Sequence, residues 1–209
     1  MSIFISIEGF DGTGKSTQAK LLKENLKKSN IDSKLVREPG STDFSEKIRD
    51  ILRKNTEIET ITELLLFQAS RSELVNKVIK PNLEKGKVVI TDRYIDSSLA
   101  YQGYGGGLDL ELIKSLNNIS TSGLLPSLTF LLDMDVEDSL KRTEDRNNNE
   151  QINKFEKKDF AFHQNVKNGF IDIFDNNNLR IIKVDASKDI EVISKQLLKI
   201  TLEKINEIV

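Results

Sequence analysis

The chain contains no cysteine, and His163 is the single histidine among its 209 residues. Without cysteine it has no disulfides, thiolate zinc sites, iron–sulfur clusters or cysteine nucleophiles. One histidine also leaves little room for imidazole metal sites or a Ser-His triad. We expect His163 to be a helix residue with no chemical role.

A strong excess of one charge is also missing, because 31 Lys and Arg face 33 Asp and Glu. A nucleic-acid-coating surface needs a basic excess. No run approaches the ~18 apolar residues of a membrane span, and the first residues do not resemble a secretory signal. We therefore expect a cytoplasmic protein that binds neither nucleic acid nor membranes, folded as one domain over 1–209.

Arginine is scarce, since the 31 basic residues divide into 23 Lys and 8 Arg. Together with abundant Asn and Ile, this indicates a composition biased against arginine. Each arginine that remains is therefore a candidate for a role that lysine cannot fill. Three of them, Arg49, Arg53 and Arg180, match no functional pattern.

Short apolar runs rich in β-branched residues alternate with longer stretches of helical periodicity. The predicted strands cover 3–7, 34–36, 88–91, 128–132 and 181–184. Clear helical spacing covers 16–28, 61–83 and 190–208. Strands that are apolar on both faces indicate a parallel sheet covered on two sides. We predict an α/β three-layer sandwich with a five-stranded parallel sheet.

The first predicted strand is followed by a match to G-x-x-x-x-G-K-[ST], the P-loop motif. Its glycines let backbone N–H groups approach a phosphate chain, and the following helix offers its positive N-terminus. Lys15 would reach the β- and γ-phosphates, and the Ser16 hydroxyl would ligate Mg²⁺. The predicted ATP-binding residues are Gly9, Phe10, Asp11, Gly12, Thr13, Gly14, Lys15 and Ser16.

Residues outside the P-loop narrow the class of nucleotide-binding protein. The guanine-specific N-K-x-D motif is absent, because the nearest string, at 153–156, reads Asn-Lys-Phe-Glu. Motor-like ATPases usually end a strand with Asp-Glu, whereas the strand at 88–91 is followed by Asp92 and Arg93. Asp92 would help to hold Mg²⁺, and Arg93 suggests a second anion beside the triphosphate. A nucleotide kinase, whose acceptor phosphate needs no general base, fits both residues.

Four blocks together resemble the thymidylate kinase family, which phosphorylates dTMP to dTDP with ATP. They are the P-loop containing Asp11, Arg-Glu-Pro-Gly at 37–40, Leu-Phe-Gln-Ala-Ser-Arg at 66–71, and Asp-Arg-Tyr-Ile-Asp-Ser-Ser-Leu-Ala-Tyr-Gln-Gly at 92–103. The resemblance runs almost from end to end. It implies ATP and dTMP as substrates, Mg²⁺ as cofactor and a homodimer.

The resemblance also assigns roles around dTMP. Arg37 and Arg93 would grip its phosphate through bidentate contacts. Phe67 would stack on thymine, and Arg71, one helical turn later, would reach its O4. The remaining expected contacts are Asp11 with the 3′-OH, Tyr101 with the 2′ carbon, and Gln102 near the base or phosphate. Ser98 is also expected to bind the substrate. Tyr101, seven residues after Tyr94, is predicted to share a helical face with it.

The polar stretch 144–157 resembles the flexible lid of this family. Position 12 is glycine, as in the lid-dependent bacterial form, and Arg142 and Arg146 match its paired lid arginines. The family usually continues with Asp-Arg-x-Glu, where this chain has Lys154 in place of the arginine. The sequence leaves open which of these three cations contacts the transferring phosphate.

The sequence leaves two alternatives open. One is another nucleoside monophosphate or deoxynucleoside kinase, although the Phe67 and Arg71 pair favours thymidylate. The other is a non-catalytic nucleotide-binding module. That module would show a damaged P-loop or lost arginines, and the sequence shows neither.

Overall fold

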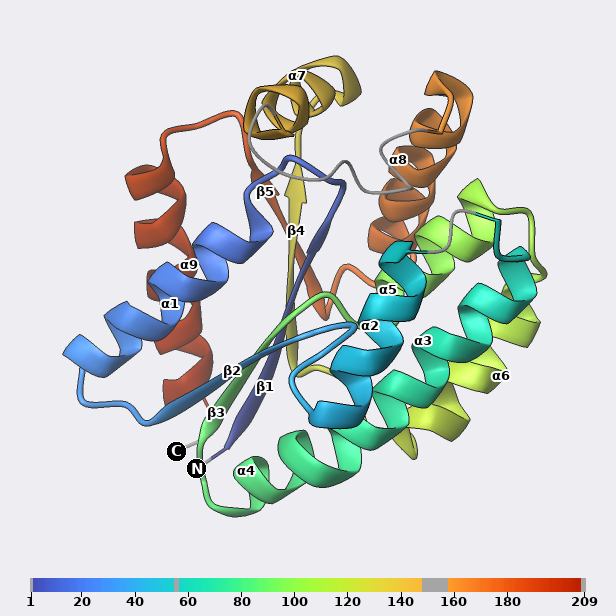
Figure 1. Ribbon diagram of the computed structural model, residues 1–209. Coiled ribbons are helices and arrows are strands. Elements are labelled where there is room, and N and C mark those ends of the chain that lie inside the picture. Colours follow the sequence, from blue (N-terminus) through green and yellow to red (C-terminus); the bar gives the residue numbers. More distant parts are fainter. Residues whose placement is uncertain (1, 55–56, 148–157, 208–209) are drawn as a thin grey trace.

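Five parallel strands form a single sheet in the order β2-β3-β1-β4-β5. The structure is a computed structural model that describes residues 2–54, 57–147 and 158–207 (Figure 1). The strands are β1 (Ile3–Gly9), β2 (Ser33–Arg37), β3 (Val88–Asp92), β4 (Leu128–Asp133) and β5 (Ile181–Asp185). All five predicted strands are confirmed, and each end agrees within two residues.

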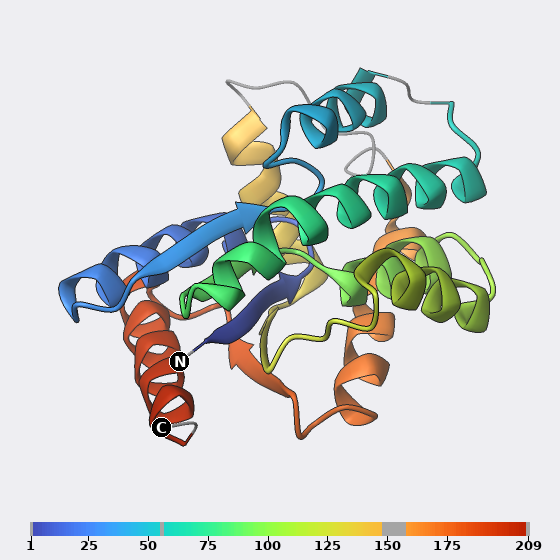
Figure 2. The same ribbon diagram turned by 90° about the horizontal axis from the view of Figure 1, so that it is seen from below.

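Helices cover both faces of this sheet, which confirms the predicted three-layer α/β architecture (Figure 2). The helices are α1 (Lys15–Lys28), α2 (Asp43–Lys54), α3 (Thr60–Leu74), α4 (Lys80–Glu84), α5 (Ile95–Ser98), α6 (Leu110–Thr121), α7 (Val136–Asn147), α8 (Phe160–Asp175) and α9 (Ile190–Asn206). Two π-helical segments, η1 (Val75–Ile79) and η2 (Leu99–Gly105), continue α3 and α5. In the described part of the chain, no helix is long and apolar enough to cross a bilayer.

Side chains of β1 alternate between two cores, as expected for a strand covered on both sides. Ile3, Ile5 and Ile7 pack with α1 and α9 on one face. Phe4 packs on the other face with α3 and η1. The next positions on that second face carry two fully buried polar residues, Ser6 and Glu8. These polar side chains interrupt an otherwise apolar strand.

Strand register brings three functional segments to one edge of the sheet. Asp92 at the end of β3 lies opposite Arg37 of β2 on one side and opposite Ile7 of β1 on the other. The carboxyl ends of these strands are therefore level. The P-loop and the segments after β2 and β3 begin at this edge, which is where parallel sheets usually place their ligands.

Two predicted boundaries need correction. The helix predicted over 61–83 is interrupted, because η1 inserts a π-helical segment between α3 and α4. The predicted lid over 144–157 starts too early, because 144–147 belong to the last turn of α7. The rest of that predicted lid, 148–157 with Lys154, lies outside the described residues.

Candidate active site

The loop between β1 and α1 has the geometry that its motif predicts. Gly14 has a φ of +87°, and α1 starts at the next residue. The buried Lys15 ammonium and the Thr13 hydroxyl both donate to the carbonyl oxygen of Phe10, at 2.5 and 2.8 Å. Burial, with a contribution from Arg93, lowers the pKa of Lys15 to about 8. A cation and the positive N-terminus of α1 thus meet where a phosphate chain would lie.

Two glycines of the loop are required by close packing. At Gly9, with a φ of +136°, a Cβ would clash with the backbone of Leu132 in β4. At Gly12, with a φ of +82°, it would clash with the carbonyl oxygen of Ser139 in α7. Position 12 therefore cannot carry an arginine in this conformation, so any additional cation must come from outside the loop.

The side chains predicted to hold a metal ion meet at the end of β3. The Ser16 hydroxyl donates a hydrogen bond to the Asp92 carboxylate. These are the oxygen ligands that Mg²⁺ prefers, usually completed by phosphates and waters. Among the described residues, no group of three or more His, Asp or Glu side chains could hold a metal. The Ser16 hydroxyl and the Asp92 carboxylate could hold such an ion together with nucleotide phosphates.

Arg93 connects the P-loop to the segment after β3. Its φ of +71° is unusual for a residue with a side chain. Its guanidinium donates to the Asp11 carboxylate, to the Tyr101 hydroxyl at 3.2 Å and to the Gly9 carbonyl at 3.2 Å. Burial would raise the pKa of Asp11, but Arg93 and Lys15 hold it below its usual value. A fixed cation thus lies beside the P-loop.

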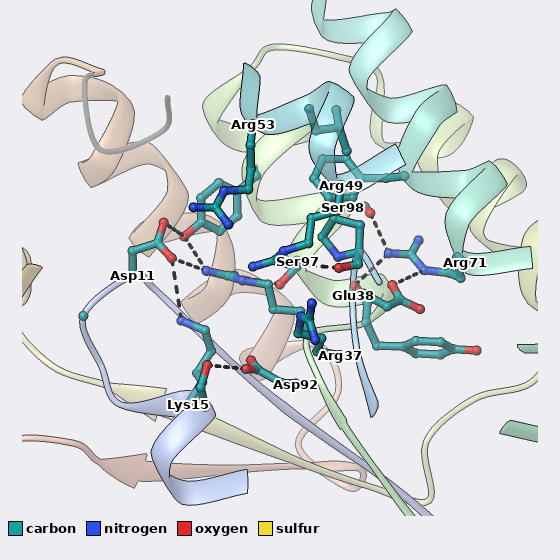
Figure 3. Close-up of a pocket in the computed structure, with 18 of the residues that line it drawn as sticks. Asp11, Lys15, Arg37, Glu38, Arg49, Arg53, Arg71, Asp92, Ser97 and Ser98 are labelled. Atoms are coloured by element: carbon teal, nitrogen blue, oxygen red, sulfur yellow. Dashed lines mark hydrogen bonds and ion pairs between the residues drawn. The ribbon is translucent and has the colours of Figure 1, made fainter. Parts of the chain in front are cut away.

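A cavity of about 460 Å³ opens next to this loop, within the range of small-molecule sites. Figure 3 shows Asp11 and Lys15 at one end, Arg71 at the other, and Arg49 and Arg53 reaching in from α2. Of the seven arginines whose side chains the structure describes, six line it, namely Arg37, Arg49, Arg53, Arg71, Arg93 and Arg142. Arg49 and Arg53, which match no functional pattern in the sequence, are thus part of the cavity lining.

Most residues predicted for the site are found in this cavity. Those that line it are Asp11, Gly12, Gly14, Lys15, Ser16, Arg37, Phe67, Arg71, Asp92, Arg93, Ser98, Tyr101, Gln102 and Arg142. Gly9, Phe10 and Thr13 shape the loop through the contacts above. The side chain of Arg146, on α7, lies outside what the structure describes. Arg142 donates to the carbonyl oxygen of Ala186 at 3.0 Å.

Arg71 at the far end of the cavity is only 1% exposed. Its five N–H groups all have acceptors, at 2.6 to 3.2 Å: Glu38, Asn117, Gln68, the carbonyl oxygen of Tyr94 and the Ser98 hydroxyl. Burial raises the pKa of Glu38 even though Arg71 opposes it. Any ligand that accepts from Arg71 must therefore replace a protein partner, and the 3.2 Å contact with Gln68 is the longest.

Gln102 is held in one orientation by a residue that sequence reasoning missed. Its amide Nε2 donates at 2.8 Å to Glu63, and both side chains are buried. A carboxylate accepts and does not donate, so the amide nitrogen must face Glu63. The carbonyl oxygen of Gln102 is then the atom that can face the cavity. The sequence feature that could have revealed Glu63 is an acidic residue on the buried side of α3.

Tyr94 and Tyr101 do not share a helical face, so that prediction was wrong. Tyr94 precedes α5, packs edge-on against Phe4 at 4.9 Å and donates to the carbonyl oxygen of Leu124. Tyr101 lies in η2, and its ring is under the Arg93 guanidinium at 4.9 Å. The π-helical turns of η2 contain more than 3.6 residues, so a spacing of seven does not return to the same face.

The remaining candidates are structural in this arrangement. Arg180 forms a two-bond ion pair with Asp96, at 2.9 Å for each bond, and also donates to Thr129. His163 is buried in α8 with its ring edge-on to Phe10 at 5.1 Å. Neither lines the cavity.

Comparisons with known proteins agree on one family. The family model described as Thymidylate kinase matches residues 7–197. A thymidylate kinase from Exiguobacterium sp. is 43% identical over 207 residues, covering 98% of this chain and 96% of that protein. One from Dehalococcoides mccartyi is 48% identical over 189 residues, covering 90% and 89%. The crystal structure of thymidylate kinase from Ehrlichia chaffeensis has a TM-score of 0.79 at 36% identity, covering 96% and 98%.

Proposed function

The chain belongs to the thymidylate kinase family, and we propose that the cavity between the P-loop and Arg71 is where it phosphorylates dTMP. The protein is a phosphotransferase that converts dTMP to dTDP with ATP. The observation that supports this location is that six of the seven arginines with described side chains line one cavity next to a P-loop. Other nucleotide kinases and a non-catalytic module are not favoured.

The acceptor nucleotide would lie with its phosphate toward Arg93 and its base toward Arg71. Arg37 and Arg93 would bind the phosphate, and Arg49 now joins them as a third guanidinium on that side of the cavity. Phe67 lies one helical turn before Arg71 and would stack on the thymine. Planar guanidinium groups suit this task because they bind phosphate through two parallel hydrogen bonds.

The base edge would be recognised by Arg71 and Gln102 together. Thymine offers acceptors at its carbonyl groups and a donor at N3. The Gln102 carbonyl oxygen fits the N3 hydrogen, because its amide nitrogen is engaged by Glu63. Arg71 would donate to O4 by giving up its longest contact, to Gln68. Ser98 would hold Arg71 in place during this exchange.

Phosphoryl transfer here would depend on position and charge. The attacking phosphate oxygen of dTMP is already anionic, so no general base is required. Lys15 and Arg93 are fixed cations at the P-loop end, and Arg142 and Arg146 would add charge from α7. Asp11 would accept from the 3′-OH of dTMP, and the Tyr101 ring would lie against the 2′ carbon. Mg²⁺, held by Ser16 and Asp92, would neutralise charge on the phosphates of ATP.

We also propose that the protein is a homodimer. Neighbouring helices α2, α3 and α6 expose large apolar side chains, with Phe44 and Leu65 each 50% exposed and Ile119 73% exposed (Figure 1). Leu65→Glu should give a monomer in light scattering after size exclusion, whereas Val192→Glu, on α9 across the sheet, should not. An unchanged mass in both variants would rule out this face. The cytoplasmic location stays a prediction.

Steady-state phosphorylation of dTMP, dUMP, dCMP, dGMP and dAMP with ATP tests the proposed function. We expect the highest kcat/KM for dTMP, and loss of at least ~100-fold in kcat for Lys15→Ala, since fixed charge is a large part of such catalysis. Preference for another nucleotide would favour the related-kinase alternative. Nucleotide binding without turnover would favour the non-catalytic module.

A further inference from the structure

Glu8 is a buried acid directly behind the P-loop that the proposed reaction does not use. It is 0% exposed and immediately precedes Gly9. Three donors point at its carboxylate: the Ser6 hydroxyl at 2.9 Å, the Tyr94 N–H at 2.7 Å and the Ser97 hydroxyl at 2.6 Å. An acid this deeply buried is rare unless its hydrogen-bonding partners are all in place.

Two of these three bonds hold the segment that carries Arg93. The Ser97 oxygen donates its hydrogen to Glu8 and accepts one from Arg93 Nη1 at 3.0 Å. The Tyr94 N–H follows Arg93 directly, so its bond to Glu8 fixes the backbone next to the left-handed residue. A positive φ is unfavourable at a residue with a side chain and persists only where surrounding contacts impose it.

We propose that Glu8 is a positioning residue for the proposed reaction, holding the Arg93 guanidinium where the acceptor phosphate binds. It acts through Ser97 on the side chain and through the Tyr94 amide on the backbone. The inference rests on the proposed role of Arg93. A merely structural Glu8 would stabilise the fold without affecting dTMP more than ATP.

The charges around Glu8 make its protonation state responsive near neutral pH. Asp96 and Arg93 face it from the segment after β3, Lys15 from α1 and Arg180 from the residue before β5. Burial and Asp96 raise the pKa of Glu8 to about 7, while Ser97, Arg93 and Ser6 oppose them. A protonated Glu8 would present a hydrogen to one of its three donors, and the bonds that fix Arg93 would rearrange.

Three single substitutions separate positioning from packing. Glu8→Gln keeps the shape but presents an amide to Ser97. Ser97→Ala removes the link between Glu8 and Arg93. Ser6→Ala is the matched control, because it removes a bond to the same carboxylate that does not reach the Arg93 segment. Circular dichroism and thermal unfolding establish that each variant is folded.

Kinetics for dTMP and ATP, with dTMP binding by calorimetry, then test the proposal. We expect Glu8→Gln and Ser97→Ala to lose at least ~10-fold in kcat/KM for dTMP with little change in KM for ATP, since a misplaced contact group costs this much or more. Ser6→Ala should keep the plateau kcat. In the parent, we expect kcat/KM for dTMP to fall on the acidic side of its pH profile as Glu8 becomes protonated. This fall should flatten in Glu8→Gln. It should move to higher pH in Ser6→Ala, because the Ser6 hydrogen bond lowers the pKa of Glu8.

The dTMP phosphate itself titrates near pH 6, but it is the same in every variant, so differences between variants report on the protein. Equal losses in all three variants, or an unchanged dTMP kcat/KM in Glu8→Gln, would overturn the positioning role. If Glu8→Gln does not fold, normal dTMP kinetics in Ser97→Ala would overturn it. A parent protein without dTMP turnover would instead contradict the proposed function.

Discussion

At the scale of single residues, the orientation of one amide is expected to decide base selectivity. Glu63→Gln lets the partner of Gln102 donate as well as accept, so the Gln102 amide can turn over. Its NH₂ group would then face the base and suit the N3 acceptor of cytosine. We expect the dTMP to dCMP ratio of kcat/KM to fall by ~10-fold or more, in line with the penalty for unpaired buried polar groups.

The exposed Glu59→Gln, one turn earlier, is the matched control for this measurement. It changes the same charge without touching Gln102 and should leave the ratio unchanged. A ratio equal to the parent's in Glu63→Gln would show that Gln102 does not need this partner.

Glu8 also predicts how stability depends on pH. Its pKa is raised from 4.5 to about 7 in the folded state, so the folded protein binds more protons than the unfolded chain between these values. The free energy of unfolding should therefore fall as pH rises from about 5 to 8, by about 3 kcal/mol from this group. Urea unfolding of the parent and Glu8→Gln checks this. A constant difference between them across that range would contradict the assignment.

Residue types could be predicted from sequence more reliably than their partners. The P-loop, Arg37, Arg71 and Arg93 were found because short motifs place them. Arg49 and Arg53 were missed because no motif includes them, although the scarcity of arginine already singled them out. Glu8 was missed because its partners, Tyr94 and Ser97, are more than 80 residues away.

At the scale of elements, α2 and α7 contribute arginines with different expected effects. Arg49 on α2 donates to the carbonyl oxygen of Pro39 at 3.0 Å, beside Arg37 on the acceptor side of the cavity. Arg142 on α7 is next to the P-loop. We expect Arg49→Ala mainly to raise KM for dTMP, and Arg142→Ala mainly to lower kcat, each by ~10-fold or more.

Initial-rate kinetics with dTMP varied at saturating ATP distinguish the two outcomes. Lys141→Ala, an exposed cation next to Arg142 with no described contact to the cavity, is the control and should change neither constant. If Arg142→Ala raised KM and left kcat unchanged, Arg142 would contribute to substrate binding and not specifically to the transition state.

Elements themselves were predictable only where hydrophobic periodicity is regular. The five strands follow from short β-branched runs, and α1 and α9 follow from helical spacing. The π-helical segments η1 and η2 do not, because a π-helical segment leaves almost no mark in a 3.6-residue pattern. That is why Tyr101 was assigned to the wrong face while still being placed correctly in the cavity.

At the scale of the whole molecule, the order of strands could not be derived from spacing. Alternating strands and helices indicate a parallel sheet, but many strand orders satisfy that pattern. The order β2-β3-β1-β4-β5 places β3 beside β1, and this adjacency brings Arg93 to Asp11 across 82 residues. The family resemblance predicted that Asp11 and Arg93 belong to one site, which periodicity alone could not predict.

The arginines that line the cavity should affect the rate at which nucleotides associate with the protein. The molecule carries a net charge of −2, so its average field repels anions weakly, yet the cavity concentrates positive charge between low-dielectric walls. Such focusing raises encounter rates for anions and is screened over about 10 Å at 0.1 M salt. Stopped-flow association of dTMP should therefore slow as salt increases, more so than dissociation speeds up. An association rate that does not depend on salt would mean that the carboxylates lining the cavity cancel the field of the arginines. An association rate that declines with salt would show that a protein with a net negative charge can still attract nucleotides electrostatically.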